Sequence, residues 1–411
     1  MTGGVQIQMK ILLATYWILP HVGGVDTYLH VLKQGLEERG HQVDILGTHP
    51  QSNHVYMLTD NRTIEKKSIL YPMHDMLMDY FEQELPELDH WARYRDIERH
   101  VYEMASVLLG LNHYDIIHTQ DVISTRALSR VAPSHIAHVA TIHGLIMDEF
   151  FVTGEIEQED SLRWKYSYAE ERLGASSAAA TILPSEWLRR EYVNRFFVSP
   201  EKLTVIPYGL NSEQIFQQTD AIARMPREDG RLVIICPARL VPYKGQRYLI
   251  EALAELVKVR TDFICQFAGD GAQRGELEML SQQLNVQDHV QFLGNRKDIY
   301  YLLRQADIFI LPSLVENHSL AVMEAQIIGL PVVTTRVGGS PELLSHLHTG
   351  LLVEPRNSQE LFQAILLLMN DEALRKRLST NSKKWARKYW SPDNMIERTL
   401  QVYQEALEKK K

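Results

Sequence analysis

Two glutamates, Glu316 and Glu324, stand eight positions apart in the segment "ENHSLAVME". Positions eight apart differ by about 80° around a helix, so a single helix would not bring both carboxylates to one face. The two side chains converge if Glu316 lies in a loop and a helix begins near Leu320. Carboxylates placed in this way accept hydrogen bonds from hydroxyl groups, which is what the binding of a polyol requires.

The residues around these glutamates contain signals for the start and the end of a helix. Ser319 is a suitable N-cap, Gly329 is a suitable stop and Pro331 prevents continuation, so a helix is expected over about residues 320–328. The N-terminus of a helix offers free backbone N–H groups and the positive end of the helix dipole to an anion. The pattern predicts a ligand with both phosphate and hydroxyl groups. Taken alone, it also fits a solvated helix acid at 324 that follows a capping residue at 316.

Arg239 and Lys244 lie in "CPARLVPYKGQ", directly after an apolar run. Loops after parallel strands line the ligand crevice of α/β sheets. A guanidinium and an ammonium five residues apart can clamp a diphosphate, the first by paired hydrogen bonds and the second as a point charge. Two Gly-rich segments follow other strands. "AGDG" with Gly269 suits either a ligand or a tight turn, and in "VGGSPELL" Ser340 is expected to cap a helix that begins at Pro341.

The elements that would position these residues alternate between apolar runs and helical patterns. In the N-terminal half, strands are expected at residues 11–20, 42–47, 115–120, 138–144, 180–185 and 203–209, with helices at 26–40 and 76–111. In the C-terminal half, strands are expected at residues 231–238, 262–271, 290–294, 307–313, 331–336 and 350–355, with helices at 245–260, 276–286 and over most of 371–411. This alternation predicts two doubly wound, Rossmann-like α/β domains that face a cleft.

The polar segment 211–230 divides the two series and is expected to be a linker. The expected domains are residues 1–210 and residues 231–388, with a helix at 389–411 that crosses back to the first domain. Two domains also agree with the length of 411 residues, because single cores stop growing at roughly 250 to 300 residues.

Composition and charge narrow the classes of function. Apolar residues make up 45% and charged residues 23%, as in ordinary globular enzymes. Residues 1–205 carry a net charge of about −10 and the remainder about +1, which argues against nucleic acid or an anionic membrane at the first half. Cys236 and Cys265 lie inside apolar runs and are expected to be buried thiols in a reducing cytosol. Because no apolar stretch reaches about 18 residues, a cytosolic protein with at most peripheral membrane contact is expected.

Taken in order along the chain, the motifs resemble those of the retaining nucleotide-sugar glycosyltransferases of family 4, or glycosyl transferases group 1, which share the two-domain glycosyltransferase B fold. The motifs are "LPHVGGV", "TIHG", "PSEWLRREY", "VIPYGLN", "PARLVPYKG", "AGDG", "QFLG", "LPSLVENHSLAVMEA", "GLPVVTTRVGGSPEL" and "GLLVEP". The resemblance covers nearly the whole chain, and it implies that residues 1–210 are an acceptor-side domain and residues 231–388 a donor-binding domain. It implies transfer of a hexosyl group from a UDP- or GDP-sugar to an acceptor hydroxyl, in the synthesis of cell-surface or coat polysaccharide or of a glycoconjugate.

The resemblance also assigns roles to individual residues. Arg239 and Lys244 would bind the donor diphosphate. Glu324 would bind the ribose hydroxyls and Glu316 the hydroxyls of the transferred sugar, while His143, at the end of an expected strand, would lie beside the reacting sugar. The expected catalytic residues are therefore Glu316, His143, Arg239 and Lys244. The expected donor-binding residues are Gly23, Gly24, Arg239, Lys244, Gly269, Asn317, His318, Ser319, Leu320 and Glu324.

One departure from the family pattern concerns the donor sugar. The commonest form after the first glutamate is Glu-Gly-Phe-Gly, whereas Asn317, His318 and Ser319 stand here. The backbone amides that would meet the sugar remain, but the side chains add bulk. The identity of the donor sugar therefore does not follow from the resemblance.

The expected reaction needs neither a metal nor a cofactor. The chain has no Asp-x-Asp of the metal-binding type and no His or Cys cluster at ligand spacing. Arg239 and Lys244 would stabilise the negative charge that develops on the leaving nucleoside diphosphate. The resemblance implies same-face substitution, in which a leaving phosphate oxygen helps to deprotonate the acceptor, so that the anomeric configuration is retained.

Other classes of function fit parts of the pattern. A nucleotide-sugar-binding protein without catalysis, and a sugar-nucleotide 2-epimerase or a phosphorylase of the same fold, would keep much of the donor site, although a phosphorylase needs a pyridoxal lysine. A Rossmann dehydrogenase is disfavoured because no G-x-G-x-x-G follows either first strand. The acceptor, whether a sugar, a lipid-linked molecule or a small molecule, does not follow from the sequence.

Overall fold

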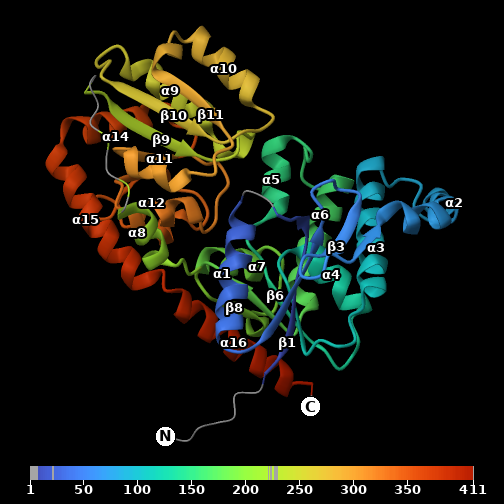
Figure 1. Cartoon of the computed structure of the whole chain (residues 1–411). Coiled ribbons are helices and arrows are strands. Elements are labelled where there is room, and N and C mark those ends of the chain that lie inside the picture. Colours follow the sequence, from blue (N-terminus) through green and yellow to red (C-terminus); the bar gives the residue numbers. More distant parts are fainter. Residues whose placement is uncertain (1–7, 21–22, 221, 223–224, 226–229, 411) are drawn as a thin grey trace, which may run out of the picture. The chain divides into compact units, whose positions relative to one another are not determined.

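The protein is described from a computed structural model, which covers residues 8–20, 23–220, 222, 225 and 230–410 of the chain (Figure 1). The chain folds into two compact units. The first unit comprises Met1–Pro207 and Pro392–Lys411, and the second comprises Tyr208–Ser391. Each unit is a layered α/β structure around a mostly parallel sheet, which confirms the expected fold class.

The first unit contains an eight-stranded sheet with the strand order β4-β3-β2-β1-β5-β6-β7-β8. All neighbouring strands are parallel except β3, which pairs antiparallel with both of its neighbours. Ile11, Leu12 and Leu13 on the central strand have no exposed surface, as a parallel sheet covered on both faces requires. The strands are β1 Lys10–Ile18, β2 Gln42–Thr48, β3 His54–Met57, β4 Thr63–Glu65, β5 Ile116–Thr119, β6 Ala137–Thr141, β7 Ala180–Leu183 and β8 Leu203–Val205.

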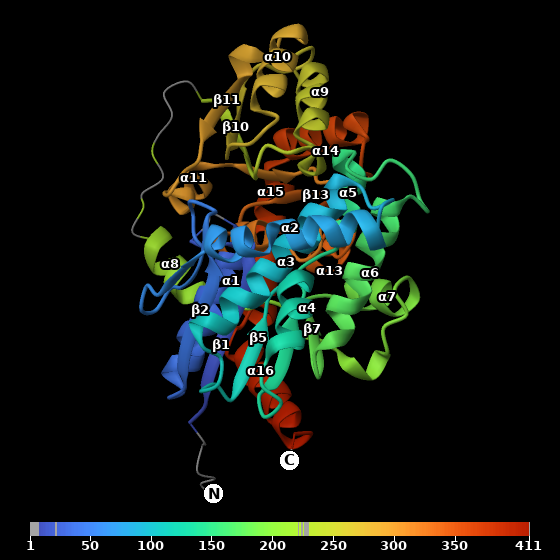
Figure 2. The same ribbon diagram turned by 90° about the vertical axis from the view of Figure 1, so that its right-hand side faces the viewer.

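Helices cover both faces of this sheet. One face carries α3, α4 and α6, the other carries α1 and α16, and α2 lies outside α3 (Figure 2). The helices are α1 Gly24–Glu38, α2 Lys66–Glu84, α3 His90–Leu109, α4 Val122–Val131, α5 Ile146–Thr153, α6 Leu162–Ser177, α7 Glu186–Asn194 and α16 Pro392–Glu408, with a 3-10 turn at Pro200–Lys202.

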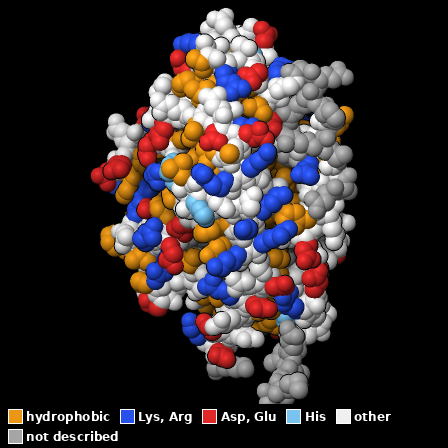
Figure 3. All heavy atoms as spheres, turned by 90° about the vertical axis from the view of Figure 1, so that its left-hand side faces the viewer, with side chains coloured by type: hydrophobic (Ala, Val, Ile, Leu, Met, Phe, Trp, Pro, Cys, Tyr) orange, Lys and Arg blue, Asp and Glu red, His pale blue; other side chains and the backbone are white. Residues whose placement is uncertain are grey.

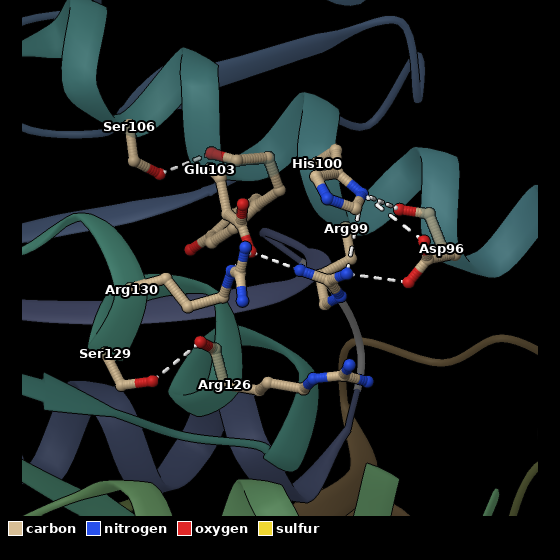
Figure 4. A network of polar contacts seen from close by, with 9 residues as sticks. Asp96, Arg99, His100, Glu103, Ser106, Arg126, Ser129 and Arg130 are labelled. Atoms are coloured by element: carbon tan, nitrogen blue, oxygen red, sulfur yellow. Dashed lines mark hydrogen bonds and ion pairs between the residues drawn. The ribbon is translucent and has the colours of Figure 1, made fainter. Parts of the chain in front are cut away.

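Polar side chains fix how two of these helices sit on the sheet. Asp121 caps α4 by accepting a hydrogen bond from the Ser124 N–H at 2.7 Å, and its other oxygen accepts from the Thr15 hydroxyl at 2.8 Å. This one carboxylate therefore ties α4 to the end of β1. Arg99 is buried on α3 and donates to Asp96 and Glu103 of the same helix, and Arg130 of α4 lies 3.1 Å from the same Glu103 (Figure 4). Because a buried charge is costly unless it is paired, this network sets the contact between the two helices.

The second unit contains a six-stranded parallel sheet with the order β11-β10-β9-β12-β13-β14. Its strands are β9 Leu232–Pro237, β10 Phe263–Ala268, β11 Val290–Gly294, β12 Ile308–Leu311, β13 Val332–Thr335 and β14 Leu351–Val353. Its helices are α8 Ser212–Asp220, α9 Gln246–Leu256, α10 Arg274–Gln283, α11 Ile299–Gln305, α12 Leu320–Ile328, α13 Ser340–Leu343, α14 Ser358–Asn370 and α15 Glu372–Tyr389, with 3-10 turns at Pro242–Lys244 and Gln287–His289.

The order of the strands indicates where a ligand is expected in this unit. The chain runs from β9 outward to β11 and then returns to β12 on the other side of β9, so the direction of winding reverses between β9 and β12. The loops after these two strands lie on either side of the reversal, which is where doubly wound sheets bind ligands. The predicted residues Arg239, Lys244 and Glu316 all lie in these two loops.

The predicted strands are all present, but the structure contains further elements. An antiparallel hairpin of β3 and β4 follows β2, and the expected helical stretch 76–111 is two helices, α2 and α3, separated at residues 85–89. Residues 212–220 of the expected linker form α8, whose Ile215 and Thr219 are buried. The positions 221, 223–224 and 226–229 of that segment lie outside the described residues.

Two further expectations concern the thiols and membrane contact. Cys236 and Cys265 are both free and buried, as predicted from their apolar surroundings. In the described part of the chain, no helix combines the length and the apolar character that crossing a membrane would need.

Candidate active site

Lys244 and Glu316 form an ion pair between the loops that follow β9 and β12. The Lys244 Nζ lies 2.8 Å from Oε2 of Glu316, and the two side chains are 18% and 12% exposed. The same oxygen accepts a hydrogen bond from the Ser313 hydroxyl at 3.2 Å. The backbone joins the two loops as well, because the N–H of Leu314 donates to the carbonyl of Tyr243 at 2.7 Å. These hydrogen bonds therefore hold the Lys244–Glu316 pair in place.

Gly245 explains how the two loops approach so closely. Its φ is +68°, a conformation that residues with a side chain rarely adopt, and a Cβ at this position would lie 2.1 Å from the carbonyl oxygen of Pro312. The chain turns at Gly245 into α9 directly after Lys244. Only a residue without a side chain lets the loop after β9 pack on the end of β12, so the glycine sets the position of the lysine.

Arg239 is held beside the pair by its own loop. Its guanidinium donates to the Tyr243 hydroxyl, and its carbonyl accepts from Nε2 of Gln246 at 2.8 Å. The guanidinium carbon of Arg239 and the ammonium of Lys244 each lie 5.7 Å from the centre of the Tyr243 ring. Both cations of this loop thus lie near the Tyr243 ring. The Arg239 side chain is exposed.

Gly269, at the end of β10, lies next to this loop. A Cβ on Gly269 would lie 2.1 Å from the carbonyl oxygen of Ala238, so the glycine is needed for close packing of the two backbones. The neighbouring Asp270 carbonyl accepts from the N–H of Leu240 at 3.0 Å. Of the two uses considered for "AGDG", the tight backbone contact is therefore present.

Glu324 lies in the second turn of α12, which begins at Leu320 and ends at Ile328, as predicted. Gly329 ends the helix in the left-handed conformation with φ +88°, also as predicted. Oε1 of Glu324 accepts a hydrogen bond from the Tyr300 hydroxyl at 3.3 Å. Burial raises the pKa of Glu324 to about 7, although the Tyr300 hydrogen bond lowers it in part. This carboxyl group therefore titrates near neutral pH.

Asn317, His318 and Ser319 form the buried part of the loop before α12, with exposed fractions of 5%, 6% and 8%. The His318 ring lies edge-on between Tyr208 and Trp390, with its centre 5.2 Å from each ring. Burial lowers the pKa of His318 to about 3, so the ring is neutral at physiological pH. The histidine therefore holds the loop from behind by packing against two aromatic side chains.

The helix caps near this loop differ from expectation in two respects. Ser319 occupies the N-cap position of α12, but its side chain makes no capping hydrogen bond. The expectation that Ser340 caps the next helix is wrong, because Gly339 is the N-cap and Ser340 is the first helical residue. The helix starts one residue earlier than predicted, and close packing requires a glycine at its N-cap: a Cβ on Gly339 would lie 2.7 Å from Oδ1 of Asn317. The "VGGSPEL" turn is thus pressed against the loop that carries Glu316.

His143, Gly23 and Gly24 belong to the first unit, away in sequence from the residues above. Nε2 of His143 lies 3.3 Å from Oε1 of Gln120, and its ring meets Tyr28 edge-on at 5.0 Å. Burial lowers the pKa of His143 to about 3, so the imidazole is neutral at physiological pH. Gly23 is the N-cap of α1 and Gly24 its first residue. His21 and Val22 of the "LPHVGGV" motif lie outside the described residues.

A buried histidine of the neighbouring strand supports β6, which ends two residues before His143. His118 of β5 lies 2.6 Å from the Tyr403 hydroxyl of α16 and 2.7 Å from Oγ1 of Thr141, at the end of β6. Thr141 in turn lies 3.3 Å from the Tyr28 hydroxyl. This chain of hydrogen bonds links α16, β5, β6 and α1, and it fixes the Tyr28 ring against which His143 packs.

Several residues of this arrangement were not predicted from the sequence. Tyr243, Tyr300, Ser313 and Gln120 each contact a predicted residue, and Gln246 holds the Arg239 carbonyl. Tyr243 stands in the quoted motif "VPYKG", so its place next to both cations was a usable signal. Tyr300 carried no such signal, because it is 24 positions from Glu324 on another helix. Within the part of the chain that the structure describes, no three His, Cys, Asp or Glu side chains form a group suited to a metal ion.

Comparison with known proteins agrees with this geometry. The sequence model described as Glycosyltransferase Family 4 matches residues 22–214, and that described as Glycosyl transferases group 1 matches residues 217–385. The MMP alpha-(1->4)-mannosyltransferase of Mycolicibacterium hassiacum is 27% identical over 435 residues, which cover 97% of this chain and 98% of that protein.

Solved structures show the same fold. Sucrose-phosphate synthase of Thermosynechococcus elongatus matches with a TM-score of 0.75 and 20% identity, over 98% of this chain and 100% of that one. The HepE protein of Anabaena, solved in complex with UDP-glucose, matches with a TM-score of 0.64 and 18% identity, over 97% of this chain and 100% of that one. The two family models, the near full-length relative and the fold together place this chain in glycosyltransferase family 4, among the glycosyl transferases group 1, as a glycosyltransferase with the glycosyltransferase B fold.

Proposed function

We propose that this protein is a retaining, metal-independent hexosyltransferase that uses a UDP- or GDP-sugar as its donor. The observation that carries the proposal is the Lys244–Glu316 pair at the point where the sheet of the second unit reverses. A cation for the diphosphate and a carboxylate for the sugar hydroxyls stand side by side there, as the two ends of a sugar diphosphate require. The HepE complex with UDP-glucose supports the class of donor.

The proposed donor extends along the loops and the helix described above. The diphosphate meets Arg239 and Lys244, the ribose hydroxyls meet Glu324, and the transferred sugar meets Glu316. The backbone amides of residues 317–320 face the sugar. As the anomeric bond breaks, negative charge grows on the leaving diphosphate, and the two cations stabilise it without help from a metal ion. Gly23 and Gly24 are the proposed phosphate contacts from the first unit.

The proposed acceptor hydroxyl attacks from the face that the diphosphate leaves. Its proton passes to a leaving phosphate oxygen, so the bond to the acceptor oxygen forms where the phosphate bond breaks and the configuration is retained. His143 is neutral and a weak base, since its pKa is lowered to about 3. Its proposed role is therefore a hydrogen bond to a hydroxyl of the reacting sugar, rather than removal of the proton.

The biological product of this reaction is proposed only as a class. We infer a cell-surface or coat polysaccharide or a glycoconjugate. The mannosyltransferase of Mycolicibacterium hassiacum supports only the coarser part of this inference, a product with an alpha-glycosidic linkage. The buried Asn317, His318 and Ser319 distinguish this loop from the commonest family form, and they are the proposed determinants of the donor sugar.

The test combines donor binding with turnover. We expect a rise in melting temperature with either UDP or GDP, and with one of their sugar conjugates, because a ligand of the native state stabilises it by mass action. Release of nucleoside diphosphate from that conjugate, followed by NMR assignment of the anomeric proton of the product, then tests transfer and retention. Binding without any release of nucleoside diphosphate would show a non-catalytic binding protein and would contradict the proposal. An inverted product would contradict the mechanism alone.

A further inference from the structure

Helix α15 is the most basic element of the second unit. It carries seven Lys and Arg residues and only one acid, Glu372. Some of these cations already have local roles. Lys376 pairs with Glu372 at 2.7 Å, and Arg375 donates to the last carbonyls of α14. The Arg387 guanidinium lies 4.9 Å from the centre of the Phe216 ring. These three cations therefore already have partners within the unit.

A different set of α15 side chains forms one stripe along the helix. Arg377, Asn381, Lys384 and Lys388 follow each other at intervals of four, three and four residues, which is the spacing of a single helical face. Arg377, Lys384 and Lys388 are exposed, and within the described chain none of them pairs with a carboxylate. At 1.5 Å per residue the stripe is about 16 Å long. The three charges therefore lie too far apart for one small anion to meet all of them.

The stripe borders a shallow hollow of about 220 Å³ between α15 and the connection from β13 to β14. His348 lies on one side and Asn381, Lys384, Trp385, Lys388 and Tyr389 on the other. The Trp385 and Tyr389 rings lie 4.2 Å apart with their planes at 33°, and the Lys388 ammonium lies 5.0 Å from the centre of the Tyr389 ring. Tyr389 is 42% exposed. Aromatic rings and lysine side chains thus line the same hollow.

Polar groups complete the walls of this hollow. Nδ2 of Asn381 donates to the His348 carbonyl at 2.9 Å, which leaves the amide oxygen of Asn381 as an acceptor. The indole N–H of Trp385 is buried and has no hydrogen-bond partner among the described residues. Figure 3 shows the side of the molecule where α15 lies, with Lys and Arg side chains spread across its middle among hydrophobic ones.

We propose that the stripe and the hollow bind a segment of an anionic glycan, which carries carboxylate or phosphate groups along its chain. A sugar ring rests on Tyr389 and Trp385, its hydroxyl groups meet Asn381, and its charged groups meet Lys384 and Lys388. The next charged group along the glycan meets Arg377. This site lies outside the donor residues, and the inference stands whether or not the proposed transfer mechanism holds.

The arrangement favours a glycan over a lipid surface. A flat anionic membrane would use the three cations but has no group for a hollow lined by aromatic faces and an amide. A sugar ring has both apolar C–H faces for the aromatic side chains and hydroxyl groups for the amide. A glycan with repeated charges also matches the length of the stripe, whereas a single phosphate does not.

The experiment measures binding of an oligogalacturonate to the full chain by calorimetry. We expect binding that weakens with salt, because it depends on ion contacts. The variant Lys384→Gln/Lys388→Gln should bind at least tenfold more weakly. The control Lys258→Gln/Lys376→Gln removes the same net charge from exposed lysines that pair with acids three or four positions away, and it should bind as the wild type does. Tyr389→Ala should weaken binding without any change in net charge.

Each alternative has its own outcome. Equal losses in the two lysine pairs would show a nonspecific charge effect and would overturn the proposal. If a neutral malto-oligosaccharide binds as tightly as the oligogalacturonate, the cations do not contribute to binding and the proposal is wrong. If phosphatidylglycerol vesicles bind through the same lysines while the oligogalacturonate does not, the surface is a membrane contact and the proposal is wrong. Competition by inorganic phosphate at a concentration equal to that of the oligogalacturonate carboxylates would show a site for a small anion, which also overturns the proposal.

Discussion

The ammonium of Lys244 lies 2.8 Å from Oε2 of Glu316 across 72 positions of sequence. The two residues follow β9 and β12, which are neighbours in the sheet although two other strands lie between them in sequence. The sheet therefore creates the pair, and Gly245 and the bond from Leu314 to Tyr243 hold it at one distance. If this pair is the centre of the donor site, the effect on kcat of substituting one residue should depend on whether the other is present.

The first prediction concerns that dependence. Glu316→Ala and Lys244→Ala should each lower kcat by about two to three orders of magnitude, as expected for groups that meet charge in the transition state. The double variant should lose little more than either single one, because residues that act as a unit are not additive. Release of nucleoside diphosphate under saturating donor is the measurement.

The control for this cycle is a surface pair of the same kind. Lys258 and Glu255 lie 2.7 Å apart on the same unit, with exposed fractions of 64% and 44%, and Lys258→Ala should leave kcat unchanged. Full transfer activity in Glu316→Ala would contradict the assignment of Glu316 to the transferred sugar. Loss of melting temperature in step with loss of kcat would show that the pair serves the fold rather than the reaction.

The second prediction follows from the pKa of Glu324, which burial raises to about 7. If this carboxylate accepts hydrogen bonds from the ribose, its charged form should bind better. Affinity for the UDP- or GDP-sugar should then rise as pH increases through about 7 and level off above it. The sugar conjugate is the right ligand, since its esterified diphosphate does not titrate in that range.

Glu324→Gln is the matched variant for this measurement, because it keeps the size of the side chain and removes the titration. Its affinity should be weaker than that of the wild type at high pH and nearly constant with pH. A wild-type affinity that does not change between about pH 6 and about pH 8 would remove Glu324 from the ribose contact.

Much of the candidate site could be predicted from the sequence because it follows the order of strands and helices. An apolar run fixes each strand, and the loop after it must lie at the carboxyl end of the sheet. This places Arg239, Lys244 and Glu316 correctly, and the capping and stop residues give the bounds of α12. These signals are local, so a single sequence contains them.

The contacts that complete the site depend on packing between distant segments, and the sequence carries little sign of them. Tyr300 reaches Glu324 from α11, and Asn317 packs so closely on Gly339, the N-cap of α13, that no side chain fits at that position. The hairpin of β3 and β4 was not predicted, because its strands have only four and three residues. Short strands give too few alternations to distinguish them from a loop.

The third prediction concerns His318, which fills the space between Tyr208 and Trp390. His318→Ala should leave a cavity behind the loop of residues 316–319, and so loosen the backbone that carries Glu316. We expect the KM for the donor to rise about tenfold with a cost of about 2 kcal/mol in stability. His318→Phe, which keeps an aromatic ring between the two neighbours, should restore most of the KM.

Two comparisons separate this effect from general destabilisation. His289→Ala removes a ring that stacks on Phe263 at 4.7 Å, in the same unit but away from the donor loops, and it should not change the KM. If His318→Phe behaves as His318→Ala does, the imidazole itself contacts the donor. In that case the packing role assigned to His318 is wrong.

The fourth prediction concerns stability and tests the first unit independently of the reaction. Glu171 is fully buried on α6, where it accepts hydrogen bonds from the Tyr192 hydroxyl and, at 3.1 Å, from the Met147 N–H. Burial raises its pKa to about 7, and these hydrogen bonds lower it only in part. Between its unfolded value near 4.5 and about 7, the folded protein keeps a proton that the unfolded chain has lost.

The unfolded state therefore binds fewer protons in this range, and the stability of the first unit should fall as pH rises through it and then level off. The difference between the two ends is about 3 kcal/mol, from about 1.4 kcal/mol per pKa unit. Glu171→Gln removes the titration, so the stability of this variant should fall much less over the same range of pH.

Hydrogen exchange of peptides from α6 in urea, at about pH 5 and about pH 8, reports the unfolding of this unit alone. Glu157→Gln, an exposed change on the same unit, controls for the loss of one negative charge. An equal fall in wild type and Glu171→Gln would show that another group carries the pH dependence.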